Sequence, residues 1–145
     1  MHTNRVTLTL LSYWYFLAMT DAENTMSKAH ILYVDDEPNN LFAFKSVFRR
    51  NYQVATAADA TEAIALLEKE EFDLVLSDYK MPGMTGVALC EYIKTHFPKL
   101  KRMIISGYAD EEDIVLAVEN GVIAKSIAKP WNSEMLGHEI AAALK

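Results

Sequence analysis

The residues best suited to chemistry are acidic side chains that directly follow short apolar runs. One such run, Leu74-Val75-Leu76, ends in Ser77-Asp78, and the chain then breaks at Pro82-Gly83. A contiguous apolar run of this length is typical of a strand covered on both faces of a parallel sheet. Open α/β sheets bind their ligands at the carboxyl ends of such strands. Asp78 is therefore either a functional carboxylate or an ordinary turn cap, and this stretch alone leaves both readings open.

An acidic pair follows a second strand-like run. His30 to Val34 is apolar, and Asp35 and Asp36 come directly after it. If both runs belong to one parallel sheet, Asp35, Asp36 and Asp78 meet at one edge. Three neighbouring carboxylates repel one another, which raises at least one pKa unless a cation lies between them. Hard oxygen ligands at a hydrated site suit Mg²⁺, so these three residues are the predicted magnesium ligands.

Two further apolar runs end in a hydroxyl and an ammonium group. Ile104-Ile105 is followed by Ser106, and Ile127-Ala128 is followed by Lys129. Taken singly, a serine at a strand end and a lysine before a proline are common and need no function. Acidic pair, single acid, hydroxyl and lysine, each at a strand end and in this order, form a specific constellation.

This constellation resembles the receiver domain of two-component response regulators, and the resemblance runs from Ser27 to Lys145. It rests on four motifs: Tyr33-Val34-Asp35-Asp36-Glu37-Pro38, Ser77-Asp78-Tyr79-Lys80-Met81-Pro82-Gly83-Met84-Thr85-Gly86, Ser106-Gly107-Tyr108-Ala109-Asp110 and Lys129-Pro130-Trp131. The resemblance implies that Asp78 accepts a phosphoryl group from a histidine kinase in a Mg²⁺-dependent reaction. It also implies that Ser106 and Lys129 contact that phosphoryl group.

The resemblance carries three finer implications. The main-chain carbonyl of Lys80 would be a further metal ligand, and Lys80 and Tyr108 would flank the path of water to the acyl phosphate. Three positions before Lys129 the family usually has Tyr or Phe, which turns inward on phosphorylation, whereas this chain has Ser126. We therefore expect the loop that carries Tyr108 to transmit the signal, and Ser126 to contribute little.

The order of the elements predicts an α/β fold. Five strands alternate with five helices in a flavodoxin-like, doubly wound parallel sheet of order 2-1-3-4-5, similar to that of a chemotaxis regulator. The predicted strands are His30–Val34, Tyr52–Ala57, Asp73–Asp78, Arg102–Ser106 and Val122–Ala128. The predicted helices begin at Pro38, after Asp59, at Thr85 or Gly86, near the acidic run Asp110–Asp113, and at Asn132 or Ser133. Asp59 and Glu62 form a capping-box pattern, and Asp110–Asp113 are read as helix-end charges.

Composition narrows the compartment and the partners. A chain of 145 residues predicts one domain, and its net charge of −6 argues against binding to nucleic acid. The single cysteine, Cys90, excludes an intramolecular disulfide and favours a reducing compartment, so we expect a cytoplasmic protein. Cys90 itself is predicted to be a half-buried structural thiol.

Residues 1–26 lie outside the repeating pattern, and the receiver domain is predicted to span 27–145. Val6 to Met19 is apolar but shorter than the roughly 20 residues that a transmembrane helix needs. We therefore do not expect residues 6–19 to anchor the chain in a membrane. Met26 reads as a natural start of translation, and an added surface element is the other interpretation.

Two alternative functions remain: a phosphorylation-independent interaction module and a Mg²⁺-dependent phosphohydrolase. An interaction module would normally lack some of the five site residues, and all five are present here: Asp35, Asp36, Asp78, Ser106 and Lys129. A phosphohydrolase would need an insertion that caps its substrate, and the sequence shows none. The leading hypothesis is a signalling domain that is not an enzyme, although it assists its own phosphorylation and dephosphorylation.

The expected partners of this signalling domain are a histidine kinase or phosphotransfer protein and a downstream protein target. A homodimer through the helix after Asp110–Asp113, the strand ending at Ala128 and the last helix is a further expectation. The Lys129-Pro130-Trp131 motif resembles that of receiver domains that are commonly joined to output domains. A single-domain regulator and a piece of a longer regulator are therefore both open.

Overall fold

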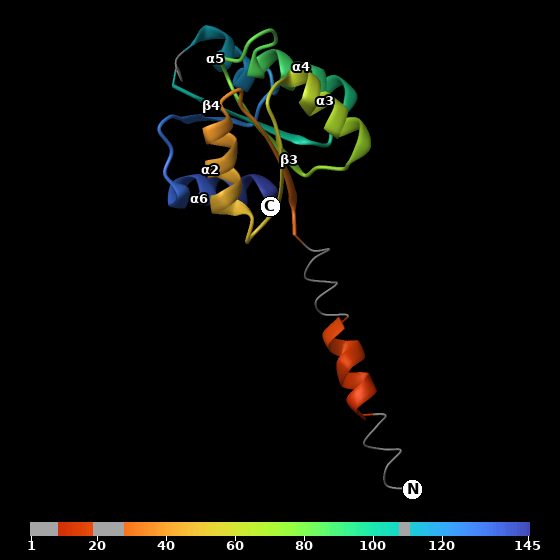
Figure 1. The fold of residues 1–145 in the computed structure, drawn as a ribbon. Helices are drawn as coiled ribbons and strands as arrows, with labels where there is room; N and C mark the ends of the chain where they lie inside the picture. Colours follow the sequence, from red (N-terminus) through yellow and green to blue (C-terminus); the bar gives the residue numbers. More distant parts are fainter. Residues whose placement is uncertain (1–8, 19–27, 108–110) are drawn as a thin grey trace, which may run out of the picture.

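The structure is a computed structural model, and it describes residues 9–18, 28–107 and 111–145. Its centre is a five-stranded parallel sheet of order β2-β1-β3-β4-β5, as the sequence predicts (Figure 1). The strands are β1 (His30–Val34), β2 (Gln53–Ala57), β3 (Leu74–Asp78), β4 (Lys101–Ser106) and β5 (Lys125–Ala128). All five residues of β3 are buried, which explains why its first three, Leu74 to Leu76, are contiguous apolar residues without alternation.

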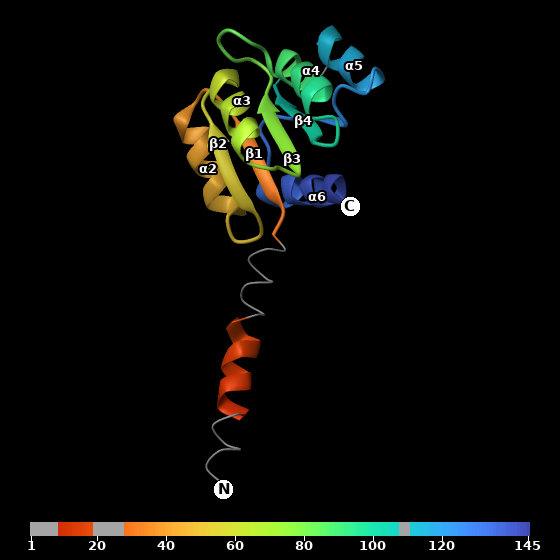
Figure 2. The same ribbon diagram turned by 90° about the vertical axis from the view of Figure 1, so that its right-hand side faces the viewer.

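Five helices cover the two faces of the sheet. One face carries α2 (Pro38–Phe48) and α6 (Ser133–Leu144), and the other carries α3 (Ala60–Lys69), α4 (Gly86–His96) and α5 (Glu112–Glu119) (Figures 1 and 2). The core is divided accordingly, because alternate residues of each strand point to opposite faces. Tyr33 and Leu76 pack toward α2 and α6, whereas Leu32 and Val75 pack toward α3 and α4.

Side-chain caps fix where three of these helices begin. Asp59 accepts a hydrogen bond from the backbone N–H of Glu62 at 2.8 Å, and the Glu62 carboxylate accepts one from the backbone N–H of Ala58. The predicted capping-box pattern is thus confirmed. Thr85 and Asn132 cap α4 and α6 in the same way.

The register brings the functional strand ends to one edge of the sheet. Val34 pairs with Ala57 on one side and with Ser77 on the other. At the far side of β4, Ser106 pairs with Ala128. The residues that follow β1, β3, β4 and β5 therefore all emerge at the same edge.

Two predicted details are wrong. Strand β5 begins at Lys125 and not at Val122, because the backbone N–H groups of Val122 and Ile123 bond to the carbonyl of Ala117 at the end of α5. Cys90 is fully buried and not half-buried, since it lies on the face of α4 that packs against Ile104 and Ile114. Burial raises the pKa of its thiol to about 12.

A sixth helix was not among the five predicted. It covers residues 9–18, and its large apolar side chains are exposed, Trp14 by 69%. Among the described residues, none of the helices combines the length and hydropathy needed to cross a bilayer.

Removing residues 1–25, so that the chain starts at Met26, is expected to leave the fold intact, because the sheet and its five covering helices all lie after Lys28. We expect a denaturant midpoint close to that of the full chain and the same slope of unfolding free energy against denaturant. A shortened chain that fails to unfold cooperatively would show that the first residues contribute to the core. The two proteins are compared by circular dichroism in urea.

Candidate functional site

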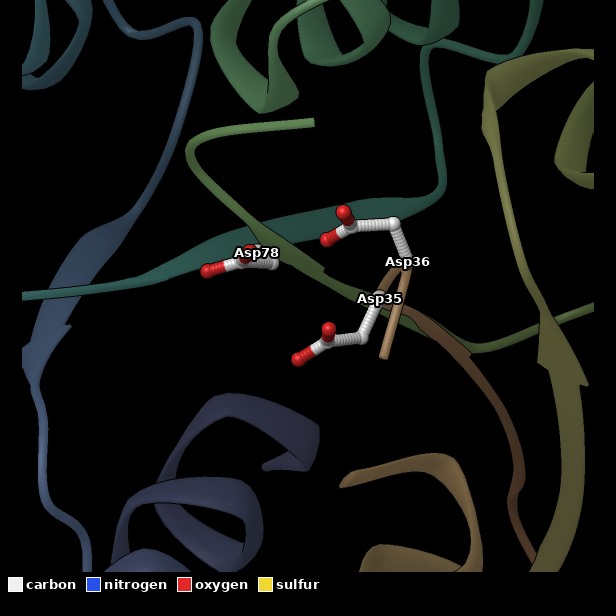
Figure 3. A group of neighbouring side chains, drawn as sticks. All are labelled: Asp35, Asp36 and Asp78. Carbon is white, nitrogen blue, oxygen red and sulfur yellow. The ribbon is translucent and has the colours of Figure 1, made fainter. Parts of the chain in front are cut away.

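Three carboxylates gather at the carboxyl edge of the sheet. Asp35 and Asp36 directly follow β1, and Asp78 is the last residue of β3 (Figure 3). One oxygen from each lies within 4.8 Å of the others. Asp35 and Asp78 are buried, whereas Asp36 is exposed, so two of the carboxylates are shielded and the third is open to solvent. This donor set fits a hard divalent cation such as Mg²⁺, which keeps several of its waters.

Lys129 forms an ion pair with Asp78. Its Nζ lies 2.7 Å from Oδ1 of Asp78 and 3.8 Å from Oδ2 of Asp35. Burial raises the pKa of Asp78, and the hydrogen bond and charge of Lys129 only partly offset that effect, so the net direction is upward. For Lys129, burial lowers the pKa, but the hydrogen bond and charge of Asp78, together with the charges of Asp35 and Glu37, outweigh it, and the net direction is again upward. Burial outweighs the ion pair at Asp78 and not at Lys129, because Asp78 is the more deeply buried partner.

Asp35 is held by three donors besides Lys129. Its Oδ2 accepts hydrogen bonds from the hydroxyl of Tyr33 at 2.9 Å and from the amide of Asn40 at 3.0 Å. Its Oδ1 accepts one from the backbone N–H of Glu37 at 2.9 Å. Burial, and then the charge of Asp35, raise the pKa of Tyr33, so the hydroxyl stays protonated and donates. The sequence reading missed Tyr33 and Asn40, because an aromatic residue in an apolar strand reads as core.

The four remaining predicted site residues lie in different places. Ser106 is buried at the end of β4, next to the strand that leads to Lys129. Lys80 is exposed in the loop two residues after Asp78. Tyr108 lies outside the described residues. Ser126 lies on β5 opposite Ile104, and its buried hydroxyl has no hydrogen-bond partner within the described part of the chain.

Tyr79, the residue after Asp78, makes a contact that the sequence did not reveal. Its hydroxyl donates to Oδ2 of Asp113 in the first turn of α5, at 2.5 Å. This bond, followed by burial, raises the pKa of Tyr79 to about 12. Asp113 is thus more than the helix-end charge that was predicted: it ties α5 to the chain beside Asp78. Asp110 of the same acidic run lies outside the described residues.

Gly86 permits the chain to approach the end of β3. A Cβ atom at this position would lie 2.2 Å from the carbonyl oxygen of Asp78 and 2.8 Å from Cδ1 of Ile104. The backbone N–H of Gly86 donates to the carbonyl of Tyr79 at 2.8 Å, which closes the loop after β3. Any side chain here would push against the strand that carries Asp78.

A family profile decides the classification. The profile of the response regulator receiver domain matches residues 31–141, which is more than half of the chain. The chain belongs to the response regulator receiver family. Members of this family are phosphorylation-accepting signalling domains of two-component systems and phosphorelays, and they bind Mg²⁺ at an acidic pocket.

Relatives of this receiver domain fall into two kinds. The hydrogenase transcriptional regulatory protein HoxA of Cupriavidus necator is 35% identical over 118 residues, which are 81% of this chain but 24% of that protein. The chain thus spans about a quarter of the length of such transcriptional regulators. Sporulation initiation phosphotransferase F of Bacillus subtilis is 31% identical over 121 residues, which are 83% of this chain and 94% of that protein.

Solved structures of receiver domains superpose on the chain. A CheY-like receiver domain from Methanospirillum hungatei has a TM-score of 0.77 and 35% identity, covering 81% of this chain and 94% of its own. The response regulator TrrA of Thermotoga maritima, solved in complex with Mg²⁺-BeF, has a TM-score of 0.71 and 25% identity, covering 80% and 99%. These matches confirm the predicted family and the predicted fold.

The raised pKa of Asp78 leads to a prediction about stability. Because the folded protein holds this proton more tightly than the unfolded chain, the contribution favours folding below the ordinary pKa and is lost as pH rises through the raised value. At pH 7 without metal, the charged carboxylate therefore costs stability. Asp78→Asn should raise the free energy of unfolding by on the order of 1 kcal/mol, and the gain should shrink toward pH 4.

The measurement is urea unfolding in EDTA at both pH values. Glu68→Gln, which changes an exposed carboxylate near the end of α3, is the matched control and should change little at either pH. A lower stability of Asp78→Asn at pH 7 would mean that the ion pair with Lys129 outweighs the cost of burial.

Proposed function

We propose that this receiver domain accepts a phosphoryl group on Asp78 from a histidine kinase or a phosphotransfer protein, in a Mg²⁺-dependent reaction, and then changes its binding to a protein target. The observation that carries the proposal is the position of the Asp78 carboxylate. It lies at the sheet edge, 2.7 Å from the Lys129 ammonium and beside two further acids. Family membership supplies the class of chemistry.

The proposed reaction is an in-line displacement at phosphorus. An oxygen of Asp78 forms the new O–P bond while the N–P bond of the donor phosphohistidine breaks, and the leaving imidazole keeps the electron pair and takes up a proton. The product is an acyl phosphate on Asp78. Lys129 would follow the negative charge to the phosphoryl oxygens, and the Ser106 hydroxyl would donate to one of them. Bound Mg²⁺, held by Asp35, Asp36, Asp78 and the carbonyl of Lys80, would neutralise the oxygens of the transferred group.

The two alternative functions receive less support from the structure. An interaction module that is independent of phosphorylation would not need a buried carboxylate at Asp78, whose charge costs free energy to bury even when paired with the partly exposed Lys129. A phosphohydrolase would need a pocket for its substrate at the acids. Two of the pockets formed by the described residues, around Phe72 and Leu100, lie at the opposite edge of the sheet from the acids. We therefore propose a signalling domain in the cytoplasm and no turnover of an external substrate.

The proposed partner surface is the face formed by α5, β5 and α6. Val115, Leu116 and Val118 of α5 are each exposed by 43 to 45%, and Met135 of α6 by 46%. This face would bind a downstream protein or a second copy of the domain. Because the chain has a net charge of −6, the domain would not bind nucleic acid itself. Residues 6–19 would not act as a membrane anchor. Residues 27–145 would form the functional domain.

Phosphorylation is tested with acetyl phosphate and Mg²⁺. The chain should gain the mass of one phosphoryl group, and Asp78→Asn should gain none, because the nucleophilic oxygen is gone. Asp73→Asn is the control and should be labelled like the wild type. Equal labelling of the wild type and the Asp78 variant in intact-mass spectrometry would overturn the assignment of Asp78. A wild-type chain that gains no phosphoryl group would overturn the proposed function as well.

The readout is tested by amide NMR with and without beryllofluoride. Because Ser126 replaces the usual aromatic residue, we expect large shifts at Gly107 and in the first turn of α5, with Tyr108→Ala changing both partner affinity and dephosphorylation rate. Ser126→Ala is the matched variant and should change neither by more than about twofold, since it removes only an unpaired hydroxyl. Large shifts confined to Ser126 and its neighbours on β5 would contradict this route.

A further inference from the structure

Tyr33 contributes a polar contact from within the hydrophobic core. The side chain is fully buried, and its ring stacks on Phe44 at a centroid distance of 4.2 Å. Its hydroxyl lies at the edge of this apolar cluster and donates a hydrogen bond to Oδ2 of Asp35 at 2.9 Å. The stacked ring and the rigid strand leave the hydroxyl little freedom to move. Tyr33 therefore presents a fixed donor to one oxygen of one acidic residue.

The donors around Asp35 are unevenly divided between its two oxygens. Oδ2 receives the Tyr33 hydroxyl and the Asn40 amide, and Lys129 lies 3.8 Å away on the same side. A carboxylate oxygen has two lone pairs, so these two hydrogen bonds fill Oδ2. Within the described part of the chain, Oδ1 receives one hydrogen bond, from the backbone N–H of Glu37, which leaves it one lone pair. The same contacts also fix the orientation of the side chain.

We propose that Tyr33 is a positioning residue of the cation site, which acts with Asn40 to occupy Oδ2 of Asp35 and so reserves Oδ1 for Mg²⁺ or a metal-bound water. The inference rests on the proposed magnesium site and adds to it the residue that orients its most deeply buried ligand. Hydrogen-bonding partners of metal ligands have this effect in general, and their loss weakens metal binding by about 10- to 100-fold.

The test variant is Tyr33→Phe, which keeps the stacked ring and removes only the hydroxyl. The expected result is that Mg²⁺ binds about tenfold more weakly by titration calorimetry. Asn40→Ala, on the partly exposed surface of α2, removes the second donor and should weaken binding in the same direction. Tyr52→Phe is the matched control, because Tyr52 packs against the same core cluster but precedes β2 at the opposite edge of the sheet.

A purely structural role is separated by urea unfolding with and without Mg²⁺. If Tyr33 only stabilises the fold, Tyr33→Phe lowers both midpoints equally and the stabilisation by Mg²⁺ is unchanged, which overturns the proposal. If Tyr33 positions Asp35, the increment due to Mg²⁺ shrinks, because the metal stabilises the folded state only in proportion to its affinity. Asp36→Ala separates a failure of the proposed role of Tyr33 from a failure of the proposed magnesium site. Loss of the increment in this variant, with an intact increment in Tyr33→Phe, rejects Tyr33 and keeps the site, whereas no increment in the wild type rejects both.

Discussion

The burial of the Asp78 carboxylate against a single ammonium group is the constraint on which the rest of the structure depends. Removing Asp78 from water favours its neutral form, and Lys129 at 2.7 Å only partly compensates. Two further acids at the same edge add to the repulsion. The metal-free domain is therefore held in an electrostatically unfavourable state, which added positive charge relieves. Such a site would favour a divalent cation and, with the cation bound, the anionic phosphoryl group proposed for Asp78.

The sheet maintains this arrangement by geometry alone. Parallel register brings the ends of β1, β3, β4 and β5 to one edge, so residues far apart in the chain meet without a dedicated loop. Gly86 lets α4 begin against the carbonyl of Asp78, and Tyr79 ties the next residue to Asp113 of α5. The first turn of α4 thus lies against the last residue of β3, and the first turn of α5 is bonded to the residue that follows it. A change of charge at Asp78 would have a short path to both first turns.

The sequence predicted which charged side chains gather at the sheet edge better than it predicted the side chains that orient them. Asp78 and Lys129 were found because apolar runs of strand length end in polar groups, and parallel topology makes such ends coincide. Tyr33 was not found, because a strand pattern reports that a side chain is buried and does not report where its hydroxyl points. The bond from Tyr79 to Asp113 spans 34 positions and depends on the packing of α5. Hydrophobic periodicity predicts elements and faces, whereas contacts of this kind follow from how the elements pack.

The position of the single cysteine makes the molecule convenient for spectroscopy. Cys90 is fully buried in α4, and the raised pKa of its thiol leaves almost no thiolate at neutral pH. Maleimide or methanethiosulfonate reagents, which attack thiolates in contact with solvent, therefore find no target in the folded domain. The natural chain can serve as its own background for spin labels or fluorophores at cysteines introduced on the surface of α5 or α6. The native thiol would become reactive only when the domain opens, so its rate of modification would report local unfolding around α4.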